Sequence, residues 1–137
     1  MTGLRTERRP LILVVENEEI VCSVCRSILE RHRFRVVCAE NSEQCLAFYR
    51  DNAAEIDLVL CDHSLPTIGR PGLIRSIRSF NKSARIVLMM MNGCDIEEVV
   101  PEDLTQTCIL LNKPFTCDRL IQAVEDGLML EPARHQL

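Results

Sequence analysis

The chain has 137 residues, 47% hydrophobic and 26% charged, which is the balance of one ordinary globular domain. Its formal net charge of −4 disfavours nucleic acid or an anionic membrane as a direct partner. No apolar run approaches the roughly 20 residues that a membrane span needs, and residues 1–10 lack the apolar segment of a secretory signal. We therefore expect a cytoplasmic protein that binds neither nucleic acid nor membrane directly.

Eight cysteines are many for a chain of this length. Most of them fall inside apolar strand-like or helix-like runs, where free cysteine behaves as a small hydrophobic residue. Cys22 and Cys25 form a CxxC pair, but it has no second pair and lies inside a helical pattern. We therefore expect reduced thiols, without a disulfide framework, a zinc site or a redox function.

Five short apolar runs predict buried strands, and they alternate with helical patterns. The strands are expected at 11–15, 34–38, the run that ends before Asp62, 85–91 and 107–111. The helices are expected at 18–32, from Ser42 to about 52, from 73 to 80, in a short patch at 95–100, and from Thr116 to about 128. Asn17, Ser42 and Thr116 are favourable N-caps for the first, second and last of them.

This alternation predicts an α/β fold, a five-stranded doubly wound parallel sheet of flavodoxin-like strand order 2-1-3-4-5. Charged residues follow three of the strands: Glu16 the first, Asp62 the third and Lys113 the fifth. In such sheets, ligands bind at the carboxyl ends of the strands. A turn would also explain Asp62 alone, but three charges at one edge favour a nucleophile or a metal ligand.

These residues resemble the receiver domain of bacterial response regulators over residues 10–130, with 1–9 and 131–137 as flexible ends. The matching segments are Ile12-Leu-Val-Val-Glu16-Asn17-Glu18, Asp57-Leu-Val-Leu-Cys-Asp62-His-Ser-Leu-Pro66, Leu73-Ile-Arg-Ser-Ile-Arg78 and Asn112-Lys113-Pro114-Phe115. Each segment alone is a weak signal, and the four together are specific.

The resemblance implies that Asp62 accepts a phosphoryl group from a histidine kinase or a phosphotransfer protein in a two-component phosphorelay. Lys113 would stabilise the charge on the phosphoryl oxygens, and the family has a cis peptide between this lysine and Pro114. A magnesium ion would be held by Glu16, Asn17, Asp62 and the main-chain carbonyl of Ser64.

Three positions depart from the family. Asn17 stands where the family has a carboxylate that binds magnesium directly, so we expect weak metal binding. The end of strand four carries methionine, Met90 or Met91 depending on the alignment, where the family has Ser or Thr. Leu110 replaces the aromatic residue of strand five that moves on activation. The usual contacts that bias a two-state element are therefore missing.

The main alternative is a pseudo-receiver, which binds partners without phosphorylation. The methionine and Leu110 favour it, and the intact Asp62 and Lys113 disfavour it. A hydrolytic enzyme is disfavoured, because no second aspartate stands two residues after Asp62 and no water-activating base is evident. We therefore expect a signalling module and no enzyme.

The last helix and strand five would form the common partner surface of the family, and with the 95–100 patch they would form the face for a dimer. No output domain is expected in this chain, because the fold uses its whole length. A stand-alone receiver and a piece of a hybrid kinase or larger regulator both stay open.

Overall fold

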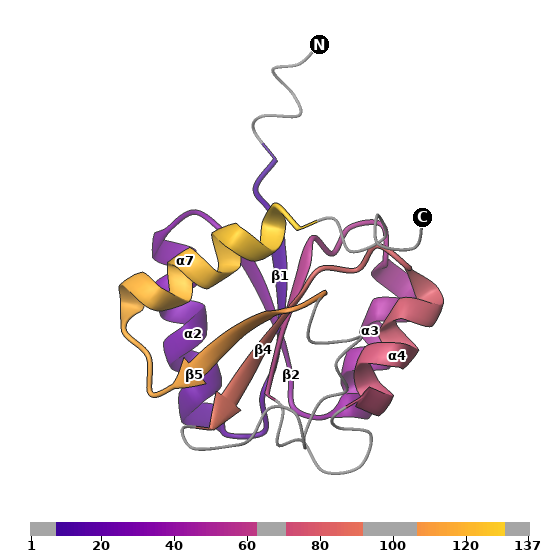
Figure 1. The fold of residues 1–137 in the computed structure, drawn as a ribbon, viewed down its shortest axis with the longest axis horizontal. Coiled ribbons are helices and arrows are strands. Elements are labelled where there is room, and N and C mark those ends of the chain that lie inside the picture. Colours follow the sequence, from indigo (N-terminus) through magenta and orange to yellow (C-terminus); the bar gives the residue numbers. More distant parts are fainter. Residues whose placement is uncertain (1–7, 63–70, 92–106, 131–137) are drawn as a thin grey trace.

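A computed structural model describes residues 8–62, 71–91 and 107–130 (Figure 1). The strands are β1 (Leu11–Val15), β2 (Arg35–Ala39), β3 (Leu58–Asp62), β4 (Ile86–Met91) and β5 (Ile109–Lys113). The helices are α2 (Glu19–Arg31), α3 (Ser42–Asn52), α4 (Pro71–Phe80) and α7 (Cys117–Leu128). Figure 1 shows α2 and α7 on one face of the sheet and α3 and α4 on the other.

The strands form one parallel sheet in the order β2-β1-β3-β4-β5, which confirms the predicted fold class. The register aligns their carboxyl ends, since Val15 pairs with Ala39 and with Cys61, and Met91 pairs with Lys113. Charged residues at the ends of different strands therefore meet at one edge of the sheet.

Each strand of the sheet's centre buries both of its faces. On the α3 and α4 side lie Leu13, Val59, Leu88 and Met90, with other residues of the same parity. On the α2 and α7 side lie the alternate positions, such as Leu60. This double burial explains the continuous apolar runs, because a strand covered by helices on both faces has no polar side.

Several predicted boundaries and caps shift in the structure. β5 continues to Lys113, two residues beyond the predicted end, because β4 offers pairing partners as far as Met91. The prediction that Asn17 caps the first helix is wrong, since the N-cap residue is Glu18 and its side chain makes no capping bond. The second helix is capped by Asn41, which accepts from the Gln44 N–H, and not by Ser42 as predicted.

The prediction for the last helix is confirmed, because the side chain of Thr116 accepts from the Arg119 N–H at 3.1 Å. The Lys113–Pro114 peptide is cis, as the family resemblance implied. The predicted helical patch at 95–100 and the ends at 1–7 and 131–137 lie outside the described residues. In the described parts of the chain, no helix is long and apolar enough to cross a membrane.

A disulfide joins Cys22 of α2 to Cys38 of β2, so the prediction that all thiols are reduced is wrong. The two residues are 16 positions apart in the sequence, and only the packing of α2 on β2 brings them together. The described free cysteines are Cys25, Cys45, Cys61 and Cys108, which are buried, and Cys117, which is exposed.

Candidate functional site

Glu16 and Asp62 lie side by side at the carboxyl edge of the sheet. Glu16 follows the last residue of β1, and Asp62 is the last residue of the neighbouring strand β3. Each of them comes two positions after a strand residue whose side chain faces α2 and α7, namely Val14 for Glu16 and Leu60 for Asp62. Because side chains alternate along a strand, both carboxylates are expected on this same side of the sheet. Both side chains are almost fully removed from solvent, with residue exposures of 1% and 2%.

Lys113 brings a positive charge to these two carboxylates. It ends β5, and its Nζ lies 3.1 Å from the Glu16 Oε1 and 3.5 Å from the Asp62 Oδ2. The lysine side chain is mostly buried, so solvent screens these two contacts only partly. The structure thus brings together the three charged residues that the sequence placed after strands one, three and five.

The site combines two carboxylates with one ammonium group, and burial together with their mutual charges sets the direction of the pKa shifts. Burial raises the pKa of Glu16, and the charge of Asp62 raises it further, against the lowering effect of the hydrogen bond from Lys113. For Lys113, burial alone lowers the pKa, but Asp62 and Glu16 together more than offset this and raise it. Both shifts mean that the site favours additional positive charge.

Backbone contacts fix the position of Glu16. Its own N–H donates to the carbonyl of Ala39 in β2 at 3.0 Å. Its carboxylate accepts from the N–H of Glu18 at 3.2 Å. Asn17, between them, is exposed and lines a polar cavity of about 470 Å³ together with Glu16.

Oxygen ligands are what a magnesium ion prefers, and Glu16, Asp62 and Asn17 supply only oxygen and amide groups. The excess negative charge around the buried Glu16 also fits a hard divalent cation. Among the described residues no group of three or more His, Cys, Asp or Glu is placed to hold a metal. Glu16 and Asp62 fit as the carboxylate ligands of such an ion, and the side chain of Asn17 is neutral. Ser64 lies outside the described residues.

The structure separates the two methionines between which the alignment left the choice open. Met90 is buried on the α3 and α4 side, with 2% exposure. Met91 is the last residue of β4, pairs with Lys113 and is 54% exposed. Met91 is therefore the residue beside the lysine at this edge. Leu110 in β5 is 41% exposed.

An apolar groove of about 520 Å³ adjoins the charged residues. It is lined by Ile20, Val21, Val24, Met91, Lys113, Pro114 and Phe115. Lys113 therefore belongs both to the groove and to the pair of ion contacts. This groove was not predicted from the sequence, although Ile20 and Val24 are four positions apart in a helical pattern. In the structure their side chains are 78% and 47% exposed.

Curated proteins of similar sequence include regulatory proteins of two bacteria. The transcriptional regulatory protein ZraR of Klebsiella oxytoca is 26% identical over 117 residues, which are 85% of this chain and 26% of that protein. The regulatory protein VanRB of Enterococcus faecalis is 29% identical over 115 residues, 83% of this chain and 50% of that protein. The chain thus spans about a quarter to a half of the length of these relatives.

A solved complex of CheX, CheY, BeF3 and magnesium from Borrelia burgdorferi contains a chain with the same fold. Its TM-score is 0.79 at 20% sequence identity, with coverage of 90% of this chain and 92% of that chain. The receiver domain of the hybrid histidine kinase CckA is 26% identical, with a TM-score of 0.71 and coverage of 87% and 99%. The sequence model of the response regulator receiver domain matches residues 12–125, and the chain therefore belongs to this family of two-component signalling domains.

Proposed function

We propose that residues 10–130 act as a receiver domain in which Asp62 accepts a phosphoryl group from a histidine kinase or a phosphotransfer protein. The observation that carries this proposal is the convergence of Asp62, Glu16 and Lys113 at the carboxyl edge of the sheet. Because such donors draw on ATP, we assign the reaction to the cytoplasm.

In the proposed reaction, a carboxylate oxygen of Asp62 attacks the phosphorus of the donor's phosphohistidine. A phosphorus–oxygen bond forms, the phosphorus–nitrogen bond breaks, and its electron pair stays on the imidazole nitrogen of the donor. Asp62 then carries an acyl phosphate. Lys113, already 3.5 Å from the Asp62 carboxylate, is placed to stabilise the charge on the phosphoryl oxygens.

Receiver domains generally bind magnesium at their acidic pocket. In this chain Glu16, Asn17, Asp62 and the main chain of Ser64 would hold the ion. When bound, it offsets the negative charge of the phosphoryl oxygens during transfer. The neutral Asn17 reduces the ligand charge by one unit, so we expect saturation only at millimolar magnesium or above.

The apolar groove is the surface that we assign to the phosphodonor. Ile20 and Val24 present exposed apolar side chains on α2, and Lys113 continues the groove toward Asp62. A helix of the donor seated on this groove would bring its phosphohistidine to the buried carboxylate. Helix-in-groove contacts of this kind use apolar side chains at such a spacing.

A pseudo-receiver that binds partners without phosphorylation is the second candidate, and Met91 favours it. This residue occupies the end of β4 beside Lys113, where the family has a hydroxyl. A thioether offers no hydrogen-bond donor to a phosphoryl oxygen. A charge-assisted hydrogen bond of about 1.5–3 kcal/mol is therefore not formed, and phosphorylation would bias β4 less than in the family.

The deciding experiment is an amide NMR titration with magnesium and then beryllofluoride, which imitates the phosphoryl group on an aspartate. We expect shifts at Glu16, Asp62 and Lys113 that disappear in Asp62→Asn. Asp57→Asn is the matched control, because Asp57 lies at the opposite end of β3 and accepts from the Leu11 N–H at 2.7 Å. It should respond as the wild type does.

The same titration separates the two candidates. A response that is confined to the acidic edge and absent from the remainder of β4 and β5 would show a phosphoacceptor without the usual switch. An Asp62-dependent response anywhere supports the phosphoacceptor. No response at saturating beryllofluoride and tens of millimolar magnesium would rule out the phosphoacceptor and leave the pseudo-receiver.

A further inference from the structure

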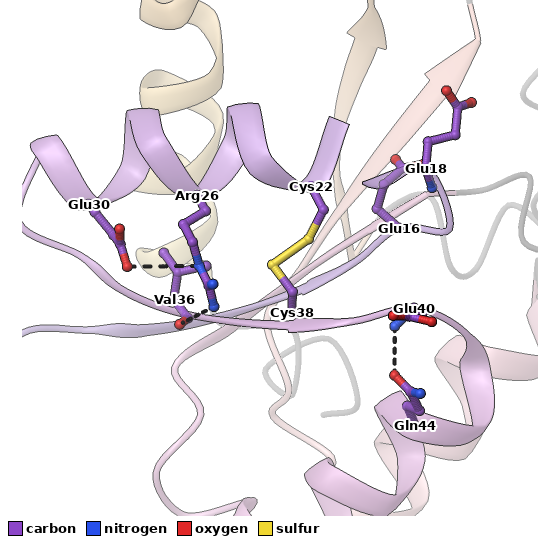
Figure 2. The surroundings of a disulfide bond; sticks show 9 residues. All are labelled: Glu16, Glu18, Cys22, Arg26, Glu30, Val36, Cys38, Glu40 and Gln44. Carbon is purple, nitrogen blue, oxygen red and sulfur yellow. Dashed lines mark hydrogen bonds and ion pairs between the residues drawn. A yellow bond between two sulfur atoms is a disulfide. The ribbon is translucent and has the colours of Figure 1, made fainter. Parts of the chain in front are cut away.

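The disulfide lies next to the acidic edge of the sheet. Figure 2 shows Cys22 reaching from the first turn of α2 down to Cys38 on β2, with Glu16 and Glu18 beside the start of the helix. The two Cα atoms are 6.7 Å apart, which is within the span of protein disulfides. The bond therefore joins α2, which follows the segment between β1 and α2, to the neighbouring strand β2.

Hydrogen bonds connect the same segment to both ends of the disulfide. The Glu16 N–H donates to the carbonyl of Ala39, the last residue of β2, at 3.0 Å. The Cys22 N–H donates to the carbonyl of Glu18 at 3.0 Å, and the Glu18 N–H donates to the Glu16 carboxylate. Opening the disulfide would remove a covalent link from this ring and give the segment more conformational freedom.

Small molecules can reach the disulfide from solvent. Cys22 and Cys38 are both half-buried, and both line the polar cavity of about 470 Å³ that Glu16 and Asn17 also line. A thiolate must approach a disulfide sulfur to exchange with it, so access decides which disulfides react. The cavity supplies this access.

The other described thiols are poorly suited to exchange, with the exception of the exposed Cys117. Burial raises the pKa of Cys25 to about 11 and that of Cys45 to about 12. Burial also raises the pKa values of Cys61 and Cys108. Thiols of this kind stay protonated and enclosed, and the thiolate is the reactive form.

We propose that Cys22 and Cys38 form a reversible redox site, opened by low-molecular-weight thiols and closed by their disulfides, whose state changes the cation affinity of the adjacent acidic edge. The second half of this proposal rests on the proposed function, because it concerns the same magnesium site. A disulfide in a cytoplasmic domain is typically transient and redox-sensing, which fits this role better than that of a permanent staple.

The exchange proceeds in two balanced steps. One external thiolate attacks a sulfur of the disulfide, forms a mixed disulfide, and releases the other cysteine as a thiolate that takes up a proton. A second external thiolate attacks the mixed disulfide and releases the remaining cysteine. Two electrons pass to the protein, and the two external thiols leave as one small disulfide.

The oxidised form should bind magnesium more tightly. In that form the segment with Glu16 and Asn17 is already held between α2 and β2, so cation binding removes little further conformational freedom. In the reduced form, cation binding must also restrict this segment. If the cost equals the backbone entropy of one residue, affinity falls by roughly fivefold or more on reduction.

The first half is tested by equilibrating the folded chain in buffers of graded reduced and oxidised glutathione, followed by alkylation and peptide mass spectrometry. We expect Cys22 and Cys38 to become alkylated together as the ratio rises, while the four buried thiols stay unmodified. Cys117→Ser is the matched control and should leave the transition unchanged. A bond that resists excess glutathione in the folded chain, or a pair that stays reduced in fully oxidising buffer, would refute the reversible site.

The second half is tested by amide hydrogen exchange on the oxidised and reduced chains without metal. We expect the hydrogen-bonded amides of Glu16 and Cys22 to exchange roughly tenfold faster after reduction, and in the Cys22→Ser, Cys38→Ser double variant. Equal exchange rates in both forms would refute the coupling.

A magnesium titration of both forms completes the test and keeps it apart from the proposed function. A weaker affinity in the reduced form supports the coupling, and equal measurable affinities contradict it. If neither form binds magnesium, the proposed function and the cation half of this inference both fail. The exchange and alkylation results would then still decide whether the redox site exists and moves the segment.

Discussion

At the scale of single residues, burial and the charge of Asp62 both raise the pKa of Glu16, so its ionised form is destabilised in the folded chain. Its carboxylate is buried beside Asp62, and Lys113 compensates only one of the two charges. Such an arrangement is unfavourable for the fold by itself, and a bound cation would offset the excess negative charge. Strained electrostatics of this kind are typical of functional sites.

We predict that Asp62→Asn lowers the pKa of Glu16. The charge of Asp62 is one of the causes that raise this pKa, and the amide removes it while keeping the shape of the side chain. Carbon-detected NMR of the side-chain carboxyl groups, without metal, measures the change. Asp57→Asn, at the other end of β3, should leave the Glu16 titration where it is. Identical Glu16 titrations in Asp62→Asn and the wild type would contradict the close placement of the Glu16 and Asp62 carboxylates.

We predict that Cys45 makes the fold sensitive to alkaline pH. Its folded-state pKa of about 12 lies above the ordinary value of 9.0, so the unfolded chain releases the thiol proton first. The contribution of the Cys45 thiol to the free energy of unfolding is therefore fully present below pH 9, and it declines as the pH rises toward 12. In Cys45→Ala the decline in the free energy of unfolding should be shallower by up to about 1.4 kcal/mol per pH unit.

Urea denaturation between pH 8 and 11 measures this slope. The Cys22→Ser, Cys38→Ser background keeps thiol–disulfide exchange out of the experiment. A Cys45→Ala slope equal to that of its parent would mean that burial does not control this thiol.

At the scale of elements, α7 approaches the centre of the sheet closely at one glycine. Gly127 sits where α7 crosses β3 and β4, and a Cβ at this position would lie 2.6 Å from the Leu58 Cδ1 and 2.9 Å from the Val87 Cγ2. Real Cβ atoms do not approach other atoms so closely. The glycine therefore lets α7 lie directly on the sheet.

We predict that Gly127→Ala lowers the free energy of unfolding by roughly 1–3 kcal/mol, because overpacking costs about this much in a dense core. The better helix propensity of alanine, up to about 1 kcal/mol, offsets only part of the loss. Chemical denaturation measures the change. Glu125→Ala on the exposed side of α7 should stay within about 0.5 kcal/mol of the wild type.

A double variant tests the physical cause. Val87→Ala alone leaves a cavity and destabilises the fold. In combination with Gly127→Ala, it leaves room for the methyl group of Ala at position 127. The double variant should therefore lose less free energy of unfolding than the two single variants lose in sum. Strict additivity would show that the contact between α7 and β4 is not the reason for the glycine.

At the scale of the whole molecule, the two halves of the core share one sheet. The helices α3 and α4 cover one face and α2 and α7 the other, and every central strand contributes side chains to both. Loss of either helical layer exposes the strands that hold the other. This architecture favours a single cooperative transition.

We predict that fluorescence of Tyr49 and far-ultraviolet circular dichroism report the same urea midpoint. Tyr49 is the only tyrosine, the chain has no tryptophan, and this side chain is 1% exposed in the α3 and α4 layer. The dichroism signal reports all helices. In the Cys22→Ser, Cys38→Ser variant, which lacks the disulfide, the two signals should again share one urea midpoint, at a lower urea concentration than in the wild type. Two separate midpoints would show that one layer unfolds before the other.

Much of the fold and part of the site could be predicted from the amino-acid sequence. Five apolar runs, alternating with helical patterns, determined the doubly wound sheet, because buried parallel strands leave no room for polar positions. The sheet order in turn predicted that Glu16, Asp62 and Lys113 meet, since carboxyl ends of parallel strands share one edge. The family match over residues 12–125 agrees with the segments that carried the resemblance.

The remaining features depend on distances between elements, which only the tertiary structure decided. Met91, and not Met90, stands beside Lys113 because the strand register sets which parity faces the site. Cys22 and Cys38 meet because α2 packs on β2, although nothing in their spacing marks them as a pair. The spacing of apolar residues along the sequence indicates which face of a helix or strand is buried. Which residues of two elements touch depends on how those faces pack together in three dimensions.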